Sequence, residues 1–449
     1  SFNPGGNFNT ISGNIKFDYN NNGCDINDFL QPNIRVNIND GTNTGASFSN
    51  NSGNYSFFTQ TGSFDLTPDI ENPTWFNFSP TTATIPFADN NNNIANQDFC
   101  ITANGIHNDL EVVIAPITPA RPGFNAVYNI VFKNKGNQTL SGDVSLNFDD
   151  AVLDFVSATL TPSLQSTGIL NWTYANLLPF ESRNIEITLN VNSPVETPAV
   201  NIGDILIFST SITPVFADDL PLDNTFSYNQ TVVGSFDPND ITCLEGASVS
   251  PSTIGDYLHY MINFENTGNF PAENVVVKTT IDPAKFDINS LQLLNTSAPV
   301  DARITGNVVE FIFKNIQLAG PGGHGHVLLK VRSKSTLVSG DNVAKRADIF
   351  FDYNFPVDTG LATTIFQTLS NSVFNTDESV SVYPNPASSK INVNCNNTIK
   401  SIELYDVQGR VLETVLNANN IDVSDKTSGI YFLKITTDNG AKIEKIIKE

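Results

Sequence analysis

Apolar and polar residues alternate in short runs along most of the chain, and Asn, Gly and Pro separate one run from the next. Alternation with a period of two is typical of strands that bury one face. Residues 128–132 and 260–264 show it most clearly, because Tyr, Ile and Phe fall on one side of each run. We therefore predict an all-β chain of tandem β-sandwiches, with almost no helix.

The first segment has four such runs within residues 10–104, and Gly53 forms a turn before alternating Tyr55 and Phe57. It resembles the prealbumin-like surface modules called SdrD B-like or carboxypeptidase-regulatory-like domains. The resemblance implies a β-sandwich over residues 1–104. It is carried by Gly13, the acidic loop from Asp18, IRVNI, GNYSF at 53–57 and QDFC at 97–100.

The middle of the chain contains an internal repeat. YNIVFKNKGN at 128–137 matches YMINFENTGN at 260–269. A repeat of this kind predicts two similar domains in tandem. In each copy the apolar side chains are expected to face the core: Tyr128, Ile130, Phe132, Tyr260, Ile262 and Phe264. We also expect the glycine of each NxGN turn, Gly136 and Gly268, to take a positive φ.

Both copies resemble the immunoglobulin-like DUF11-like domains of surface proteins, which implies sandwiches over 105–236 and 237–368. The second copy is also similar to a module that commonly precedes type IX sorting domains. The segments that carry this similarity are SFDPND at 235–240 and ADIFFDYNFPVDT at 347–359. A polar linker is predicted over 369–378.

The last segment, 379–449, has its own pattern. YPNPA at 383–387 places two prolines at the expected start of an edge strand. IELYDVQGRVL predicts a hairpin whose turn contains Gln408 and Gly409, and GIYFLKI at 429–435 is expected to be buried on both faces.

These pieces are similar in order and spacing to the type A sorting domain of the type IX secretion system. The matching positions are Tyr383, Pro384, Asn385, Pro386, Leu404, Tyr405, Asp406, Gly409, Arg410, Gly429, Tyr431, Lys442, Lys445 and Lys448. The resemblance implies an exported cell-surface protein, recognised by the shuttle barrel and translocon of the outer membrane. It also implies removal by the sortase and attachment of the cargo to surface lipopolysaccharide. The alternative is a further small sandwich without an address function.

The net charge of the chain limits the classes of partner that it can bind. Acidic residues outnumber basic ones 46 to 23, which gives a formal charge of −23. Such a surface repels nucleic acid and anionic lipid and favours a divalent cation. No apolar run approaches the roughly 18 residues of a membrane span. Because Ser1 is not an initiator Met, we expect the numbering to begin after processing or inside a longer chain.

The loop that starts at Asp18 has the DxNxNG spacing with which oxygen side chains wrap a hard cation. We predict Ca²⁺ here, and the alternative is a plain Asn-rich turn. The position that holds a bidentate Glu in an EF-hand is Phe29, which leaves open which acid completes the site. The predicted ligands are Asp18, Asn20, Asn22, the carbonyl of Cys24, and Asp25 or Asp28.

Cys24 and Cys100 bracket the first domain, and we predict that they form a disulfide, which suits an exported protein. The alternative is two buried thiols. Cys243 and Cys395 fall in different domains and are expected to be unpaired.

Two further patterns have structural interpretations. DPND at 237–240 is predicted to be a turn held by local side-chain bonds, with metal binding as the alternative. GGHGH at 322–326 is predicted to be a loop that enters a strand, with a two-histidine metal site as the alternative.

The sequence contains no motif of a known catalytic centre, so we expect a non-catalytic surface protein that acts as a stalk or adhesin. Two alternatives remain at this point: the accessory tail of a larger secreted enzyme, and a carbohydrate-binding protein that uses Trp75 or Trp172.

Overall fold

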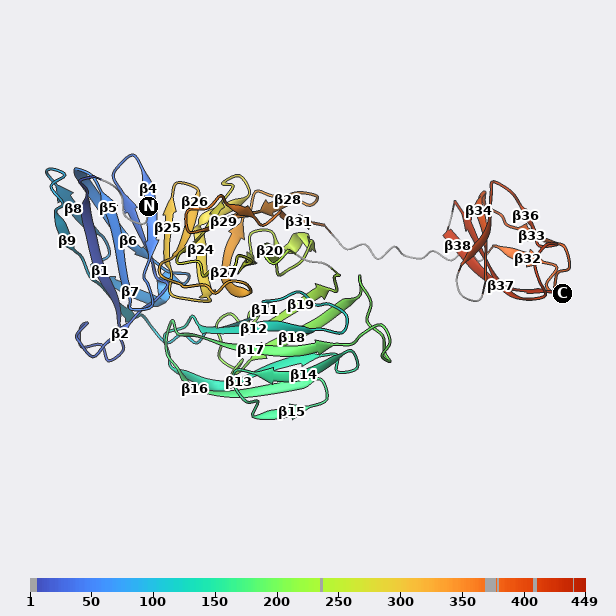
Figure 1. Cartoon of the computed structure of the whole chain (residues 1–449), viewed down its shortest axis with the longest axis horizontal. Helices are drawn as coiled ribbons and strands as arrows, with labels where there is room; N and C mark the ends of the chain where they lie inside the picture. The colour runs from blue at the N-terminus through green and yellow to red at the C-terminus, as the bar shows by residue number, and fades with distance from the viewer. Residues whose placement is uncertain (1–5, 235–236, 368–376, 378, 407–409, 439) are drawn as a thin grey trace. The chain divides into compact units, whose positions relative to one another are not determined.

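The computed structural model describes residues 6–234, 237–367, 377, 379–406, 410–438 and 440–449. The regular elements of these residues are strands, apart from two one-turn 3₁₀ helices, η1 (Pro73–Trp75) and η2 (Pro251–Thr253) (Figure 1). The all-β prediction is confirmed. The chain divides into two compact units, residues 1–368 and 369–449, and each is described by itself.

Module 1 (residues 6–104) consists of two sheets that pack around a phenylalanine-rich core. One sheet is built around β1 and contains β1 (Asn9–Asp18), β2 (Phe29–Leu30), β5 (Asn54–Thr59), β7 (Phe76–Ser79), β9 (Ile94–Asn96) and β10 (Phe99–Ala103). The other contains β3 (Arg35–Asn39), β4 (Thr44–Phe48), β6 (Gly62–Asp69) and β8 (Ala83–Phe87).

Module 2 (residues 105–234) is a sandwich of a four-stranded and a five-stranded sheet. The first has the order β11 (Leu110–Pro116), β12 (Asn125–Asn134), β17 (Ser182–Val191), β14 (Leu153–Ala158). The second has the order β15 (Leu164–Ser166), β16 (Ile169–Leu177), β13 (Leu140–Phe148), β18 (Ile205–Ile212), β19 (Thr225–Thr231).

Module 3 (residues 237–367) repeats the four-stranded sheet in the order β20 (Asp240–Cys243), β22 (Tyr257–Asn266), β27 (Gly323–Ser333), β24 (Phe286–Thr296). A small sheet contains β21 (Ser248–Val249), β31 (Ala362–Phe366) and β28 (Asn342–Lys345). The remaining strands are β23 (Val275–Thr280), β25 (Asp301–Thr305), β26 (Val308–Phe313), β29 (Ala347–Phe351) and β30 (Val357–Asp358).

The internal repeat is visible in the bonds of the two NxGN turns. Asn134 Nδ2 donates to the carbonyls of Gln138 and Leu177 at 2.7 and 2.9 Å, and its Oδ1 accepts from Gly136 N–H at 3.0 Å. Asn266 makes the corresponding three bonds, at 2.8, 2.9 and 3.0 Å. The six apolar side chains predicted to face the cores are all buried.

The predicted conformation of the two turn glycines is wrong. Neither Gly136 nor Gly268 is among the residues with positive φ. At Gly136 the requirement is space instead, because a Cβ would lie 2.4 Å from the carbonyl oxygen of His107. The glycine therefore lets the segment that enters β11 approach the turn.

The three modules are joined more closely than their tandem order predicts. β4 of module 1 pairs with β25 of module 3, which makes one nine-stranded sheet from both modules. The core of module 3 takes in Ala46 and Phe48 from module 1, and Phe180 of module 2 packs in the core of module 1. Each core is thus completed by a neighbouring module.

The C-terminal unit is a small sandwich with a core of its own, made only of residues between Val380 and Ile446. Its three-stranded sheet has the order β32 (Ser381–Tyr383), β33 (Lys390–Asn394), β36 (Asn420–Asp422). Its four-stranded sheet has the order β35 (Val411–Leu416), β34 (Ile399–Tyr405), β37 (Gly429–Thr437), β38 (Gly440–Lys448).

Candidate functional sites

The loop from Asp18 is held by its own side chains. Asp18 is buried at the end of β1, and its carboxylate accepts from the N–H groups of Asn22 and Gly23 at 3.2 and 2.8 Å. Asp28 Oδ2 accepts from Asp25 N–H at 2.6 Å, whereas the buried Asp28 Oδ1 has no hydrogen-bond partner. Asn20 Oδ1 accepts from Asn22 N–H at 3.2 Å.

The same loop is closed covalently. Cys24 is joined to Cys100 of β10, so the disulfide that the sequence predicts is present. Cys243 and Cys395 are free, and Cys243 is buried in the core of module 3. The disulfide fixes Cys24 to the β1–β10 sheet, and Lys16 Nζ of β1 donates to the carbonyl of the next residue, Asp25, at 2.5 Å.

The DPND segment forms the predicted turn. Asn239 N–H donates to Asp237 Oδ1 at 3.0 Å, and Asn239 Oδ1 accepts from Glu265 N–H at 3.2 Å. Burial raises the pKa of Asp240 to about 6, although Asn263 and Thr242 both donate to it.

The two histidines of GGHGH lie within β27 rather than in a loop before it, which corrects that prediction. His324 is exposed beside Glu265, whereas His326 is buried against Asn295, and burial lowers the pKa of His326 to about 4. Neither belongs to a group of three or more potential metal ligands among the described residues.

The two tryptophans differ in accessibility. Trp172 is buried in the core of module 2 and donates through Nε1 to the carbonyl of Leu160 at 2.9 Å, so its ring offers no face to a sugar. The expectation that Trp172 could bind a glycan is wrong, because the aromatic ring packs inside the sandwich. Trp75 is half-buried and stacks on His107 with ring centroids 4.7 Å apart.

A buried group of charges joins all three modules. Lys330 Nζ of module 3 lies 2.9 Å from Glu71 Oε2 of module 1 and 2.7 Å from Glu111 Oε1 of module 2. Lys135 lies between Glu71, Asp109 and Asp223. Both lysines keep a raised pKa because the surrounding carboxylates outweigh burial, which by itself lowers it. Sequence reasoning missed this group, since its members come from segments with no common motif.

The YPNPA segment fastens the end of the chain. Asn385 Nδ2 donates to the carbonyl of Lys445 at 2.7 Å, and its Oδ1 accepts from Ile447 N–H at 2.9 Å. Ala387 pairs with Lys448 through a parallel bridge. Tyr383 ends the edge strand β32, so Pro384 and Pro386 follow an edge strand rather than begin one.

The predicted hairpin is present, because β34 and β35 pair antiparallel. Asp406 accepts from the Arg410 backbone N–H at 3.0 Å and from its Nε at 2.7 Å, which closes the turn. Gln408 and Gly409 lie outside the described residues. Leu404 and Tyr431 are buried, and Tyr431 donates to the carbonyl of Thr427 at 2.8 Å.

The prediction that GIYFLKI is buried on both faces is wrong. Tyr431, Leu433 and Ile435 point into the core, whereas Ile430 and Phe432 are 44% and 37% exposed. On the neighbouring strand Ile447 lies opposite Ile430, and it too is exposed. The outer face of the four-stranded sheet therefore carries an apolar patch, defined as Ile430, Phe432, Ile443 and Ile447. Lys434 and Lys445 lie opposite members of this patch.

Asp377 belongs to this sandwich, although the sequence assigns it to the linker. It accepts from the hydroxyls of Ser379 and Thr437 at 2.6 Å each and from Asn397 Nδ2 at 2.8 Å. These bonds hold the pKa of the Asp377 carboxyl well below its usual range.

Comparison with known families decides the nature of this unit. The family described as "Secretion system C-terminal sorting domain" matches residues 381–449. Residues 381–449 are a type IX sorting domain. The chain is therefore a cargo of that system and is exported across the outer membrane to the cell surface. Within the described residues we find no helix with the length and apolar character of a membrane span.

The other comparisons are less specific. A domain of unknown function, DUF7619, matches residues 237–365, which is module 3. No curated protein matches the chain.

Among solved structures, the major pilin subunit of Bacillus cereus has 10% identity and a TM-score of 0.18, with 98% of this chain and 94% of that chain covered. The collagen adhesin of S. aureus has 12% identity and a TM-score of 0.21, with 58% and 92% covered. TM-scores this low support no inference about function.

Proposed function

We propose that the chain is a non-catalytic surface protein in which modules 1–3 act as a stalk or adhesin and the sorting domain acts as a removable address. The observation that supports this division most directly is that the sorting domain has a core of its own, whereas modules 1–3 share strands and core residues. A domain of this kind can be bound by the secretion machinery and cleaved off while modules 1–3 stay folded.

We further propose that the shuttle barrel of the secretion system docks on the apolar patch of the sorting domain. Ile430, Phe432 and Ile447 expose apolar area that the core does not use, and such contiguous exposed area marks interaction surfaces. After passage through the translocon, the sortase would cut before the sandwich, and the cargo would be joined to lipopolysaccharide.

The docking proposal is tested by replacing Ile430 and Phe432 with Ser and measuring the surface-exposed fraction by antibody labelling of intact cells. We expect most of the protein to stay inside the outer membrane. The matched control is Phe216→Ser, a change at a side chain of module 2 that is 92% exposed. Normal labelling of the double variant, or equal loss in the control, would contradict the proposal.

The stalk or adhesin role needs a separate experiment. Cells that export a reporter fused to residues 377–449 are compared with cells that export the whole chain. We expect both cargoes to reach the surface, and only the whole chain to restore attachment to a surface or to other cells. Equal attachment would overturn the adhesive role and leave the sorting role intact.

We also propose that the loop from Asp18 binds Ca²⁺. Support comes from the buried and unpartnered Asp28 Oδ1 beside the oxygen side chains of the loop. Calorimetric titration of Ca²⁺ into the Asp18→Ala variant and into the unchanged chain tests this proposal. Equal heats of binding would contradict a calcium site in this loop.

A further inference from the structure

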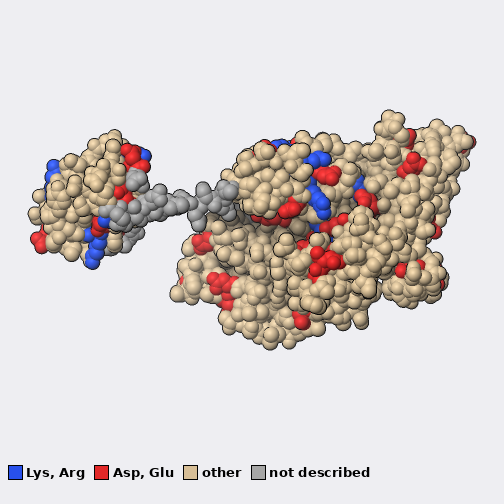
Figure 2. All heavy atoms as spheres, turned by 180° about the vertical axis from the view of Figure 1, so that it is seen from behind, with Lys and Arg blue, Asp and Glu red and all other residues tan. Residues whose placement is uncertain are grey.

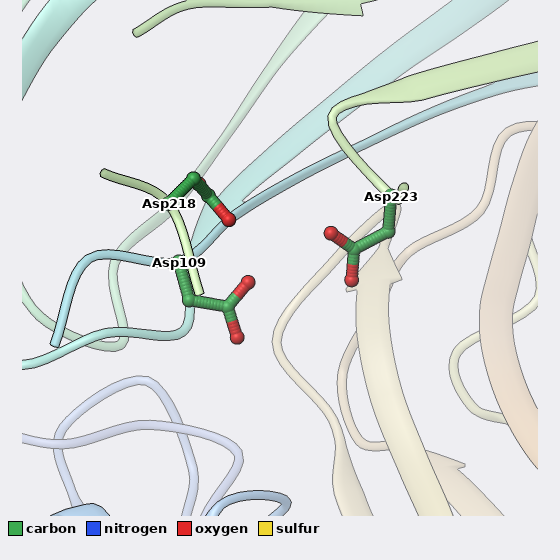
Figure 3. Close-up of side chains that lie close together, drawn as sticks. All are labelled: Asp109, Asp218 and Asp223. Carbon is green, nitrogen blue, oxygen red and sulfur yellow. The ribbon is translucent and has the colours of Figure 1, made fainter. Parts of the chain in front are cut away.

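Three carboxylates meet at one end of module 2. Asp109 directly precedes β11, whereas Asp218 and Asp223 lie in the connection between β18 and β19. Their ligand oxygens all lie within 4.8 Å of one another. Figure 3 shows the Asp109 carboxylate directed toward the space between Asp218 and Asp223. Within the described part of the chain this is the one group of three or more acidic, His or Cys side chains with that spacing.

Both oxygens of Asp218 accept backbone N–H groups, from Leu220 and Leu110, but three other oxygens at this place lack a donor. Asp109 Oδ1 and Asp223 Oδ1 are buried without a hydrogen-bond partner, and so is Oδ1 of the adjacent Asn224. Asn224 uses its other amide atom, Nδ2, to donate to Asp218 Oδ2 at 3.2 Å, which places its amide against the group. Asp109 and Asn224 are fully buried. Unsatisfied buried acceptors are costly, so these three oxygens call for a positively charged or donating partner.

The charge of the group is also uncompensated. Lys135 contacts Asp223 and lies 3.4 Å from Asp109 Oδ2, but it also lies 3.5 Å from Glu71. This lysine is therefore shared among Glu71 and two of the three aspartates, which leaves negative charge for a cation to offset.

We propose that Asp109, Asp218, Asp223 and the amide oxygen of Asn224 bind a divalent cation, and that Ca²⁺ fits them best. All the available ligand atoms are oxygens, and Ca²⁺ prefers carboxylate and amide oxygens over nitrogen or sulfur. The site is distinct from the loop at Asp18 and needs neither the sorting role nor the adhesive role of the chain.

The position of the site indicates what the cation does. Asn72 of module 1 donates through Nδ2 to Asp109 Oδ2 at 2.9 Å, so module 1 holds one ligand in place. A cation that binds Asp109 together with Asp218 and Asp223 would connect the module 1–module 2 contact to the β18–β19 connection. Loss of the cation should therefore loosen the contact between these two modules.

The test uses the whole chain carrying Asp18→Ala, which removes the other calcium candidate. The protein is stripped with a chelator and titrated with CaCl₂ by calorimetry, and its melting is followed with and without Ca²⁺. We expect binding of one equivalent and a higher melting temperature. Adding Asp223→Asn, or separately Asp218→Asn, should weaken binding by about 10–100-fold or more. The matched control is Asp219→Asn, since this neighbouring carboxylate pairs with His107 instead.

Each outcome bears on the proposal. Retained binding in the Asp219→Asn chain with loss in both other variants supports it. Circular dichroism of the calcium-free variants checks that they are folded. If one of the two substitutions prevents folding, the other still tests the site. Absence of calcium binding in the Asp18→Ala chain overturns the site, and so does unchanged affinity after Asp218→Asn and Asp223→Asn.

Discussion

The two units of the chain bury the inner faces of their small sheets differently. In residues 1–368 the modules complete one another, through the β4–β25 pairing and through Lys330, which forms ion pairs with Glu71 and Glu111 of the two other modules. In residues 369–449 one set of core residues closes a sandwich by itself. The charge differs as well: residues 379–449 carry eight basic and eight acidic residues, whereas the rest is strongly acidic. On the face of residues 6–367 seen in Figure 2, acidic groups are scattered among uncharged residues, together with some basic groups.

Tandem order along the chain therefore does not define which parts unfold as one cooperative unit. Modules 1–3 should unfold together, because each lacks part of its own core. The sorting domain should unfold separately.

The largest effect is expected for Lys330→Met. It removes the buried lysine that Glu71 and Glu111 share and should lower the free energy of unfolding of residues 1–368 by about 3–5 kcal/mol. Urea unfolding followed by tryptophan fluorescence measures it, since both tryptophans lie in this unit. The control is Lys314→Met, whose half-exposed partner is Asp301 and whose loss should cost at most about 1 kcal/mol. Equal effects of the two changes would contradict a shared charge cluster.

Removal of the disulfide comes next. Cys24→Ser with Cys100→Ser opens a link between residues 76 positions apart and should destabilise residues 1–368 by about 2–4 kcal/mol. The transition of the sorting domain, followed by circular dichroism, should not move. A shift of both transitions would show that the two units are coupled.

The repeated asparagines should give a smaller and matched effect. Asn134→Ala and Asn266→Ala each remove bonds to two carbonyls, at a cost of about 1–3 kcal/mol. Because the bonds of the two turns correspond, the two losses should be similar. A large loss of unfolding free energy in one variant alone would show that the two turns have the same hydrogen bonds but contribute differently to stability.

These comparisons also mark what the sequence could predict. Alternation at 128–132 and 260–264 was enough to predict the buried faces, and alternation on both sides of Gln408 and Gly409 predicted the hairpin of β34 and β35. Local pattern and short-range pairing carry that information.

Contacts between distant segments were not predictable in this way. Nothing in the sequence of β4 indicates that it pairs with β25, since any edge strand offers free backbone groups. Glu71 and Lys330 are 259 positions apart, and the three aspartates at 109, 218 and 223 share no spacing motif. GIYFLKI was misjudged because its exposed apolar residues imitate a strand buried on both faces.

The sorting domain should respond to acid through Asp377. Because hydrogen bonds lower the folded-state pKa of this carboxyl, its stabilising contribution is present above its unfolded pKa of about 3.9 and is lost as the pH falls below that value. Asp377→Asn should remove this dependence. The comparison is the urea midpoint of the sorting-domain transition at pH 7 and pH 3, in the variant and in the unchanged chain. An identical acid response would show that other carboxyls dominate.

The central claim is that residues 379–449 carry the export address and that the rest of the chain does not. The direct measurement is the surface-exposed fraction of a chain that ends at Ser379, determined by antibody labelling of intact cells. The account predicts that this chain folds and accumulates inside the outer membrane, while the full chain is labelled at the surface. Surface labelling of the shortened chain at the level of the full chain would contradict it.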